Sequence, residues 1–212
     1  MHPDDLREHL LGQGISRRVV EAMMTVPRDR FVPSGVRFRA WEDHAMSIGH
    51  GQTISQPTVV AMMTQAAEIR PGDHVLDVGT GSGYQAAVLA ACGARVHSIE
   101  RIPALADRAR ATLAELAPDV VVICADGAEG LVQEAPFDAV LVAAATPTVP
   151  PMLIDQLRRP GPGERGGRLV VPVGRPGAGF SQELLVLSRE EAGLGRQKLL
   201  DVVFVPLIWT GS

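Results

Sequence analysis

Cysteine is scarce in this sequence: only Cys92 and Cys124 occur among 212 residues, each inside an apolar run. Two such thiols supply neither a disulfide framework nor a cysteine-rich zinc site, so we expect both to be buried core thiols. The six histidines also lack the spacing of metal ligands along the chain. The sequence therefore predicts no metal site.

Long hydrophobic runs and an excess of positive charge are missing as well. No stretch of about 20 apolar residues occurs, and the polar start, Met1 to Arg7, lacks the apolar core of a signal peptide. With 20 Lys and Arg against 24 Asp and Glu, the formal net charge is -4, which disfavours a basic face for nucleic acid. We expect a cytoplasmic protein that binds neither membranes nor nucleic acid.

The composition that remains is typical of a folded globular protein. Hydrophobic residues make up 46% of the sequence and charged residues 21%, whereas disordered chains have fewer core-forming residues. The length suits one α/β domain with a substantial core. We predict a single, monomeric domain over residues 1–212, with N-terminal helices and a loop region in 1–57 and a sheet-containing core in 58–212.

The first quarter of the chain predicts helices followed by an irregular loop. Apolar residues recur at helical spacing from Asp4 to Met24 and are interrupted by Gly12 and Gly14, which predicts two short helices. The segment from Phe31 to Gln56 keeps no period and is rich in glycine, proline and polar residues. Long loops of this kind in compact domains are often functional.

From residue 58 onward, helical patterns alternate with apolar runs of strand length. The predicted helices are Thr58–Ala67, Gly83–Cys92, Ala104–Leu116 and Pro150–Leu157, and the predicted strands are His74–Val78, Arg95–Ile99, Val120–Cys124, Ala139–Val142 and Arg168–Val173. This alternation predicts a parallel sheet with crossover helices, and apolar strands without alternation indicate that both faces are covered. Two final strands, Glu183–Leu187 and Leu199–Leu207, joined by a polar turn at Ser188–Arg196, predict an antiparallel finish. The expected fold is a doubly wound, mostly parallel Rossmann-like α/β sheet.

The strongest motif lies where the first core strand ends. The strand leads into Gly79-Thr80-Gly81-Ser82-Gly83-Tyr84-Gln85, a glycine turn that opens a helix. Glycine permits the tight turn and the close approach of a ligand to the backbone, and ligands bind at this edge of open α/β sheets. Tyr84 occupies the place of the last glycine in a dinucleotide fingerprint, which disfavours a nicotinamide cofactor, and no P-loop motif occurs.

Acidic residues follow the next two strands. Glu100, about 20 residues beyond the loop, is suited to accept hydrogen bonds from both ribose hydroxyls of an adenosine. Asp126, followed by Gly127, would place a carboxylate near an adenine amino group. Three strand ends therefore converge on one adenosyl ligand, although a glycine turn and a terminal acidic residue are also compatible with simple packing.

These residues resemble those of class I S-adenosylmethionine-dependent methyltransferases. The stretches Trp41–Asp43 and Ile48–Pro57, together with the loop and helix Gly79–Ala90, are similar to the signature of the protein-L-isoaspartate O-methyltransferase family. Further similar stretches are Val26–Val32, Pro136–Ala139 and Phe204–Leu207. The resemblance extends from about Ile15 to Ile208. The Pro/Gly-rich stretch 159–166 looks longer than the usual link of the family. It is interpreted either as a solvated loop or as a partner-specific insertion.

The resemblance implies a cofactor, a reaction and a set of site residues. The cofactor would be S-adenosylmethionine, with S-adenosylhomocysteine as product, and the substrate the free carboxylate of an L-isoaspartyl residue in a damaged protein or peptide, whose repair begins through a succinimide. The implied catalytic residue is Ser55, although a serine before Gln-Pro is also commonly a helix cap. The expected cofactor-binding residues are Gly79, Thr80, Gly81, Ser82, Gly83, Tyr84, Gln85, Glu100, Arg101, Asp126 and Gly127. The expected substrate-binding residues are Ile54, Thr53, His50, Ala144 and Val205.

Other functions remain open at the level of sequence. A relative of the same family could methylate an ordinary aspartate in a modified natural-product peptide. A catalytically silent adenosyl-binding protein and a dehydrogenase are further alternatives, and the complete glycine loop with Ser55 argues against both.

Overall fold

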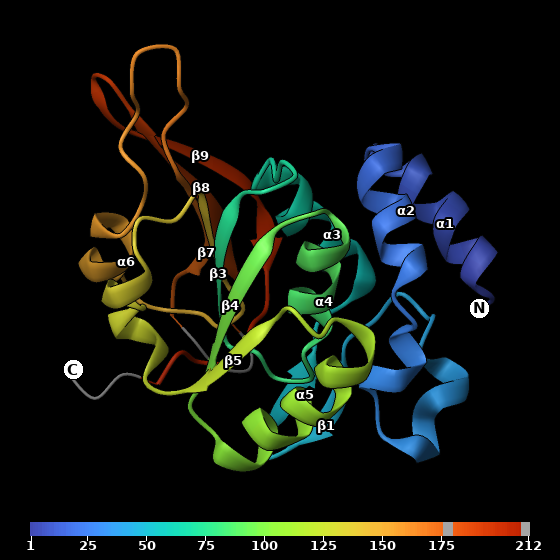
Figure 1. Ribbon diagram of the computed structural model, residues 1–212. Helices are drawn as coiled ribbons and strands as arrows, with labels where there is room; N and C mark the ends of the chain where they lie inside the picture. Colours follow the sequence, from blue (N-terminus) through green and yellow to red (C-terminus); the bar gives the residue numbers. More distant parts are fainter. Residues whose placement is uncertain (176–179, 209–212) are drawn as a thin grey trace.

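A seven-stranded sheet crosses the molecule, with helices packed on both of its faces (Figure 1). The computed structural model describes residues 1–175 and 180–208. The helices are α1 (Pro3–Gly12), α2 (Arg17–Thr25), α3 (Pro57–Ala66), α4 (Tyr84–Ala91), α5 (Pro103–Leu116) and α6 (Pro151–Asp155). The strands are β1 (Met46–Gly49), β2 (Gln52–Ile54), β3 (His74–Val78), β4 (Arg95–Glu100), β5 (Val121–Cys124), β6 (Ala139–Val142), β7 (Arg168–Val173), β8 (Gln182–Glu190) and β9 (Gly193–Val202). Short 3-10 helices are η1 (Arg28–Phe31), η2 (Ser34–Arg39), η3 (Gly127–Glu129) and η4 (Val132–Glu134).

The order of strands in the large sheet is β5-β4-β3-β6-β7-β8-β9. The first five strands in this order run parallel, while β8 pairs antiparallel with both β7 and β9. Strands β3 and β6 are neighbours although two helices and two strands separate them in sequence, so the winding of the chain reverses between them. Such a switch point leaves a crevice at the carboxyl ends of the strands. The predicted doubly wound sheet with an antiparallel finish is confirmed.

Both faces of the central strands are buried, and this explains their continuous apolar sequence. Val75 of β3 packs into the cluster that includes residues of α1 to α5. Leu76 and Val78 belong to a second cluster, which includes Leu153 of α6 on the opposite face. Figure 1 shows α3 and α4 on one side of the sheet and α6 on the other. Side chains from successive residues of one strand therefore fill two separate cores.

Strand β5 is an exception to this pattern, because it lies at the edge of the sheet. Val121 is 47% exposed and Cys124 is also exposed. The expectation of two covered faces is therefore wrong for this strand, and so is the prediction that Cys124 is a core thiol. Cys92, by contrast, is buried as predicted. An edge strand has a neighbour on one side only, so apolar sequence alone overstates its burial.

The last two strands are longer than their sequence indicated. The predicted turn at Ser188–Arg196 is wrong, because Ser188 pairs with Gly195 and Arg189 with Leu194 inside the β8–β9 ladder. The polar residues sit in the outer, largely exposed part of this hairpin, so their composition imitates a loop. Strand β9 also ends at Val202, and the following residues lie outside it rather than extending it to Leu207.

The predicted irregular loop before residue 57 contains a small hairpin that the sequence did not reveal. Strands β1 and β2 pair antiparallel, and Gly49, His50 and Gly51 between them all have positive φ angles, of 88°, 55° and 70°. Strands of four and three residues are too short for a recognisable period. The hairpin matters because Ser55 follows directly after β2.

None of the helices in the described part of the chain is both long and apolar enough to cross a membrane. The predicted domain extends to residue 212, whereas residues 209–212 lie outside the described residues.

Candidate active site

A cavity opens at the carboxyl ends of β3, β4 and β6, where the winding of the sheet reverses. Five segments and one isolated glycine enclose it. The lining residues are Gln52, Thr53, Ile54, Ser55 and Val60; Val78, Gly79, Thr80, Gly81, Ser82, Tyr84 and Gln85; Ile99, Glu100, Arg101 and Ile102; Gly127; Ala143 and Ala144; and Val205, Pro206, Leu207 and Ile208. The predicted catalytic serine and most of the predicted cofactor-binding residues therefore share one cavity.

The glycine loop needs glycine for two different reasons. Gly81 has a φ angle of 54°, in the left-handed region that favours glycine, and its backbone lines the cavity. Gly83 has a φ of 91° and is the N-cap residue of α4, where an added Cβ would approach Leu113 of α5 to 3.1 Å. Gly83 thus serves the turn and the packing of α4 against α5, and it lies outside the set of described residues that line the cavity.

Glu100 fixes the loop from the end of β4. The Gly81 N–H donates to its Oε2 at 2.8 Å, and the Ile102 N–H donates to its Oε1 at 2.9 Å. The residue is only 6% exposed, yet it lines the cavity. Each carboxylate oxygen can accept more than one hydrogen bond, so Glu100 can hold the loop and still accept donors from a ligand.

A buried polar chain beneath the loop was not identified from the sequence. The Ser98 hydroxyl donates to Asp77 Oδ2 at 2.7 Å, and the hydroxyl oxygens of Ser98 and Thr80 lie 2.6 Å apart. Burial raises the pKa of Asp77 to about 7; the hydrogen bond from Ser98 opposes this rise and the charge of Glu100 adds to it. Asp77 stands in the apolar strand that precedes the loop, and an acidic residue in such a run was the available signal.

Ser55 lies between β2 and α3, half-buried and in the cavity lining. The capping alternative for this serine is wrong, because the N-cap residue of α3 is Gln56. Asp43 serves the start of this helix instead: its Oδ1 accepts from the Thr58 N–H at 2.8 Å, and its Oδ2 accepts from the Thr58 hydroxyl at 2.8 Å. Capping by a residue from a distant loop leaves the Ser55 side chain available to the cavity.

Arg28 holds the backbone of Ser55 from inside the protein. Its side chain is fully buried; Nε donates to the Ala40 carbonyl at 2.9 Å and Nη2 donates to the Ser55 carbonyl at 2.6 Å. The guanidinium also lies over the Tyr84 ring, with Cζ 4.7 Å from the ring centroid. Because Tyr84 is the first residue of α4, Arg28 connects the serine segment with the helix that follows the glycine loop.

The remaining predicted residues divide between the cavity and its surroundings. Thr53, Ile54, Ala144 and Val205 line the cavity, as do Gln85 and Arg101. His50 lies in the exposed β1–β2 turn, outside the lining formed by the described residues. Asp126 is likewise outside it, and its Oδ1 accepts from the Ala128 N–H at 3.0 Å while Gly127 lines the cavity.

Sequence reasoning missed part of the cavity wall near the C-terminus. The Ala145 N–H donates to the Val205 carbonyl at 2.7 Å, and the Leu207 N–H donates to the Ala145 carbonyl at 2.7 Å. These bonds fix the segment after β9 beside the segment after β6, so that Pro206 and Leu207 reach the cavity. No periodicity marks this contact in the sequence, although Phe204–Leu207 is one of the stretches with a family resemblance.

The doubly wound sheet, with a glycine-loop cavity at its switch point and a buried glutamate at the end of the neighbouring strand, defines a class I S-adenosylmethionine-dependent methyltransferase. A family model described as protein-L-isoaspartate(D-aspartate) O-methyltransferase matches residues 2–211. The chain belongs to this family.

Individual relatives agree with the family assignment. A Synechococcus relative named protein-L-isoaspartate O-methyltransferase is 48% identical over 209 residues, covering 96% of this chain and 83% of the relative. A Gloeobacter violaceus relative of the same name is 49% identical over 202 residues, covering 94% of this chain and 95% of the relative. Among solved structures, a Plasmodium falciparum protein in complex with S-adenosyl-L-homocysteine has a TM-score of 0.79 at 25% identity, covering 96% of this chain and 97% of that one.

Replacement of Arg28 tests its role as a positioning residue. Lysine has one compact donor group and cannot replace the fork that reaches both the Ala40 and Ser55 carbonyls. We expect Arg28→Lys to lower kcat about 10- to 100-fold through misplacement of Ser55. Binding of S-adenosylmethionine, measured by calorimetry, should change little, because Arg28 lies outside the described cavity lining.

The control for this experiment is Arg37→Lys, which alters an exposed arginine of η2. The unfolding transition of each variant gives its folded fraction at the assay temperature, and kcat is calculated per folded molecule. An Arg28→Lys protein with the kcat of the wild type would contradict the positioning role.

Asp43 makes the stability of the site dependent on pH. Burial by itself would raise the pKa of Asp43, but hydrogen bonds from Gln56 and Thr58 outweigh it and lower the pKa below its ordinary value. The stabilisation is therefore complete above the unfolded pKa, near 4, and is lost as the pH falls through the lower folded value. We expect Asp43→Asn to destabilise the protein at neutral pH and to remove this part of the pH dependence.

Urea unfolding of the wild type and of Asp43→Asn, carried out at neutral pH and at several acidic values, measures the difference. Asp119→Asn, a change at an exposed aspartate, is the matched control. A difference in unfolding free energy between wild type and Asp43→Asn that stays constant down to the most acidic pH would refute the assignment.

Proposed function

We propose that the protein transfers a methyl group from S-adenosylmethionine to the free carboxylate of L-isoaspartyl residues in damaged proteins or peptides. The observation that carries this proposal is the meeting of Ser55 and the glycine loop in one cavity, in a chain that belongs to the isoaspartyl methyltransferase family. The methyl ester then closes to a succinimide, whose hydrolysis partly restores normal aspartyl linkages. The names of the relatives at 48% and 49% identity favour this repair reaction over peptide tailoring.

The residues of the cavity fit the cofactor of the family. Gly79 and Gly81 provide a backbone surface without side chains, and Glu100 presents a buried carboxylate with acceptor capacity for ribose hydroxyls. Gly127 lies so close to β3 that an added Cβ would stand 2.5 Å from Val78 Cγ1, so this part of the cavity lining requires glycine. We propose that these residues, with Thr80, hold the adenosyl portion.

The chemistry places few demands on the side chains. The bound cofactor supplies an activated methyl group on a sulfonium centre. The substrate carboxylate is already ionised at neutral pH, because its ordinary pKa is near 4, so the protein needs no general base. Its contribution is to place the carboxylate oxygen in line and to exclude water.

We propose that Ser55 provides this placement by donating a hydrogen bond to the substrate carboxylate. Its backbone is fixed by Arg28 on one side and by the start of α3 on the other. Thr53 and Ile54 from β2 and Ala144 from the segment after β6 form the neighbouring walls. Val205 and Leu207 cover the cavity from the C-terminal segment, which limits access of water.

Several properties of the whole molecule belong to the same proposal. We propose that residues 1–212 act as one domain, since Leu6 of α1 and Val20 of α2 share a hydrophobic cluster with Val75 of the central strand. Because the N-terminal helices and the sheet share this core, separate folding of these helices would expose its apolar side chains to water. A monomeric state and a cytoplasmic location belong to the same proposal. The proposed absence of a nucleic-acid partner is supported by the net charge of -4.

The function is tested with two peptides that differ only in one aspartyl linkage. We expect labelled methyl from S-adenosylmethionine to appear in the isoaspartyl peptide and to be absent from the aspartyl peptide. Equal labelling of both would favour the tailoring reaction, and binding of the cofactor without any transfer would favour a silent binding protein.

Ser55→Ala tests the proposed orientation of the carboxylate. Loss of the hydroxyl should reduce kcat on the isoaspartyl peptide by about 10- to 100-fold while the affinity for S-adenosylmethionine is retained. The matched control is Ser47→Ala, which removes an exposed hydroxyl from β1 of the same hairpin. Full turnover by Ser55→Ala would exclude the role.

A further inference from the structure

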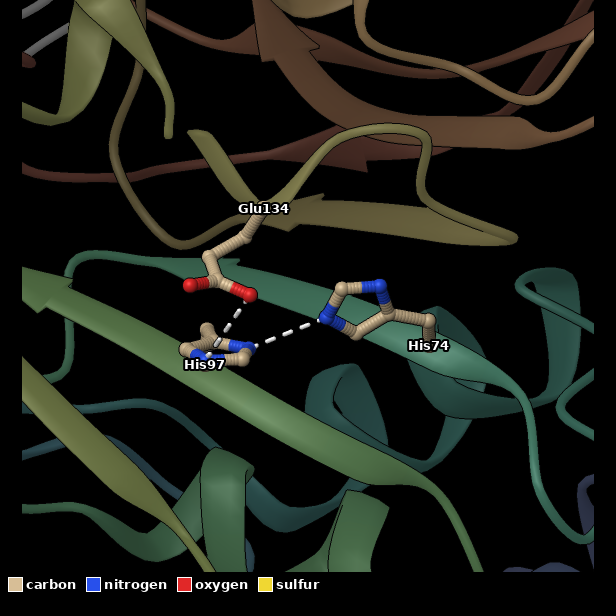
Figure 2. A group of neighbouring side chains, drawn as sticks. All are labelled: His74, His97 and Glu134. Carbon is tan, nitrogen blue, oxygen red and sulfur yellow. Dashed lines mark hydrogen bonds and ion pairs between the residues drawn. The ribbon is translucent and has the colours of Figure 1, made fainter. Parts of the chain in front are cut away.

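Three side chains of the kinds that bind transition metals lie together, two on neighbouring strands and one on η4 (Figure 2). His74 begins β3, His97 lies in β4 and Glu134 ends η4. One potential ligand atom from each residue lies within 4.8 Å of the other two. The residues are 23 and 37 positions apart along the chain, so their proximity is a product of the fold.

The distances in this cluster are close to those of a metal site. His74 Nε2 and His97 Nδ1 lie 3.0 Å apart, and His97 Nε2 lies 3.8 Å from Glu134 Oε2. Bonds of about 2.0 to 2.2 Å in a tetrahedral zinc site place neighbouring ligand atoms roughly 3.3 Å apart. Because His97 faces His74 with Nδ1 and Glu134 with Nε2, only one of its ring nitrogens can bind a shared ion. The three ligand atoms within 4.8 Å of one another must therefore come closer by rotation of the His97 ring or of the Glu134 side chain. The Glu134 side chain is 47% exposed, so it is free to make this movement.

The surroundings of His74 favour the form of imidazole that binds metals. Burial lowers the pKa of His74, the neighbouring His97 and Arg95 lower it further, and a hydrogen bond to the Pro136 carbonyl and the charge of Glu134 oppose this. A metal-binding imidazole must be neutral, and its second nitrogen is commonly held by a carbonyl or carboxylate. Arg95 is an unfavourable charge for a cation near His74, and the carboxylate of Glu134 offsets it.

We propose that His74, His97 and Glu134 bind a divalent cation of the zinc type, with solvent as the remaining ligand. Two imidazoles and one carboxylate suit Zn²⁺, Co²⁺ and Ni²⁺, whereas Mg²⁺ and Ca²⁺ require oxygen ligands. This proposal departs from the prediction of no metal, which rested on the spacing of histidines along the chain. Its chemistry is separate from methyl transfer, because His74, His97 and Glu134 all lie outside the described lining of the active-site cavity.

The position of the cluster indicates a structural effect. A bound ion would tie η4 to β3 and β4, and η4 belongs to the connection that begins near Gly127 in the cavity wall. Ligands that bind only the folded state raise its stability in proportion to their concentration above Kd. The cation should therefore raise the unfolding temperature of the protein.

The test uses untagged full-length protein, freed of metal by a chelator and titrated with Zn²⁺ by calorimetry and with Co²⁺ by visible absorption. We expect one equivalent of either ion per chain, the strong absorption of a four-coordinate Co²⁺ complex, and no binding of Mg²⁺ in the same range. Glu134→Gln and His97→Ala should each weaken binding at least about tenfold and remove the rise in unfolding temperature.

Two control variants separate this site from adventitious binding. His44→Ala removes a histidine that lies 3.5 Å from Glu42, a histidine–carboxylate pair elsewhere, and His2→Ala removes the histidine beside the N-terminal amine. Both should keep the single equivalent. Absence of saturable binding, or unchanged binding in both Glu134→Gln and His97→Ala, would overturn the proposal and leave the His74–His97 contact as a plain hydrogen bond. If His97→Ala fails to fold, the exposed Glu134→Gln change decides alone.

Discussion

The buried guanidinium of Arg28 joins the two halves of the active site. One half is the glycine loop and the strand ends of the sheet, and the other is the serine segment between β2 and α3. Arg28 donates to the Ser55 carbonyl at 2.6 Å and lies over the ring of Tyr84, which begins the helix after the loop. Burial of a charged group is costly, and the hydrogen bonds of Arg28 to the Ala40 and Ser55 carbonyls offset part of this cost. Because these bonds form only when the serine segment is in place, the arrangement favours one relative position of the two halves.

The cofactor half has its own internal support. Glu100 accepts hydrogen bonds from the N–H groups of Gly81 in the glycine loop and of Ile102 after β4. Hydrogen bonds that connect Asp77, Ser98 and Thr80 support the loop from the sheet. These groups are buried, and hydrogen bonds in a low-dielectric interior are strong. Methyl transfer to an ionised carboxylate depends on alignment more than on proton transfer, so rigid support of this kind serves the chemistry directly.

The two ends of the parallel sheet have different roles. The carboxyl ends of β3, β4 and β6 form the proposed catalytic cavity, whereas His74 stands at the first residue of β3 and joins His97 and Glu134 beside η4. The chain segment from Gly127 to Glu134 runs between these regions. Its first residue lines the cavity and its last belongs to the proposed metal site. A cation bound by Glu134 would therefore also restrain the segment that begins with Gly127 in the cavity lining.

The amino-acid sequence by itself determined the sheet and the cofactor half of the site. Continuous apolar runs such as Leu169–Val173 identify buried strands, and the glycine loop with Glu100 is a local pattern whose geometry follows from backbone sterics. The short β1–β2 hairpin and the exposure of Cys124 had no such pattern. Short strands show no recognisable period, and the position of a strand at the edge of a sheet does not follow from its amino-acid composition.

Only the tertiary structure decided which distant residues meet. Asp43 caps a helix that begins 14 residues later, Arg28 reaches Ser55, and Val205 returns beside Ala145. His74, His97 and Glu134 likewise come together only when β3, β4 and η4 are packed. The physical reason is that local sequence constrains backbone conformation, whereas contacts between side chains far apart in the chain depend on how complete elements pack.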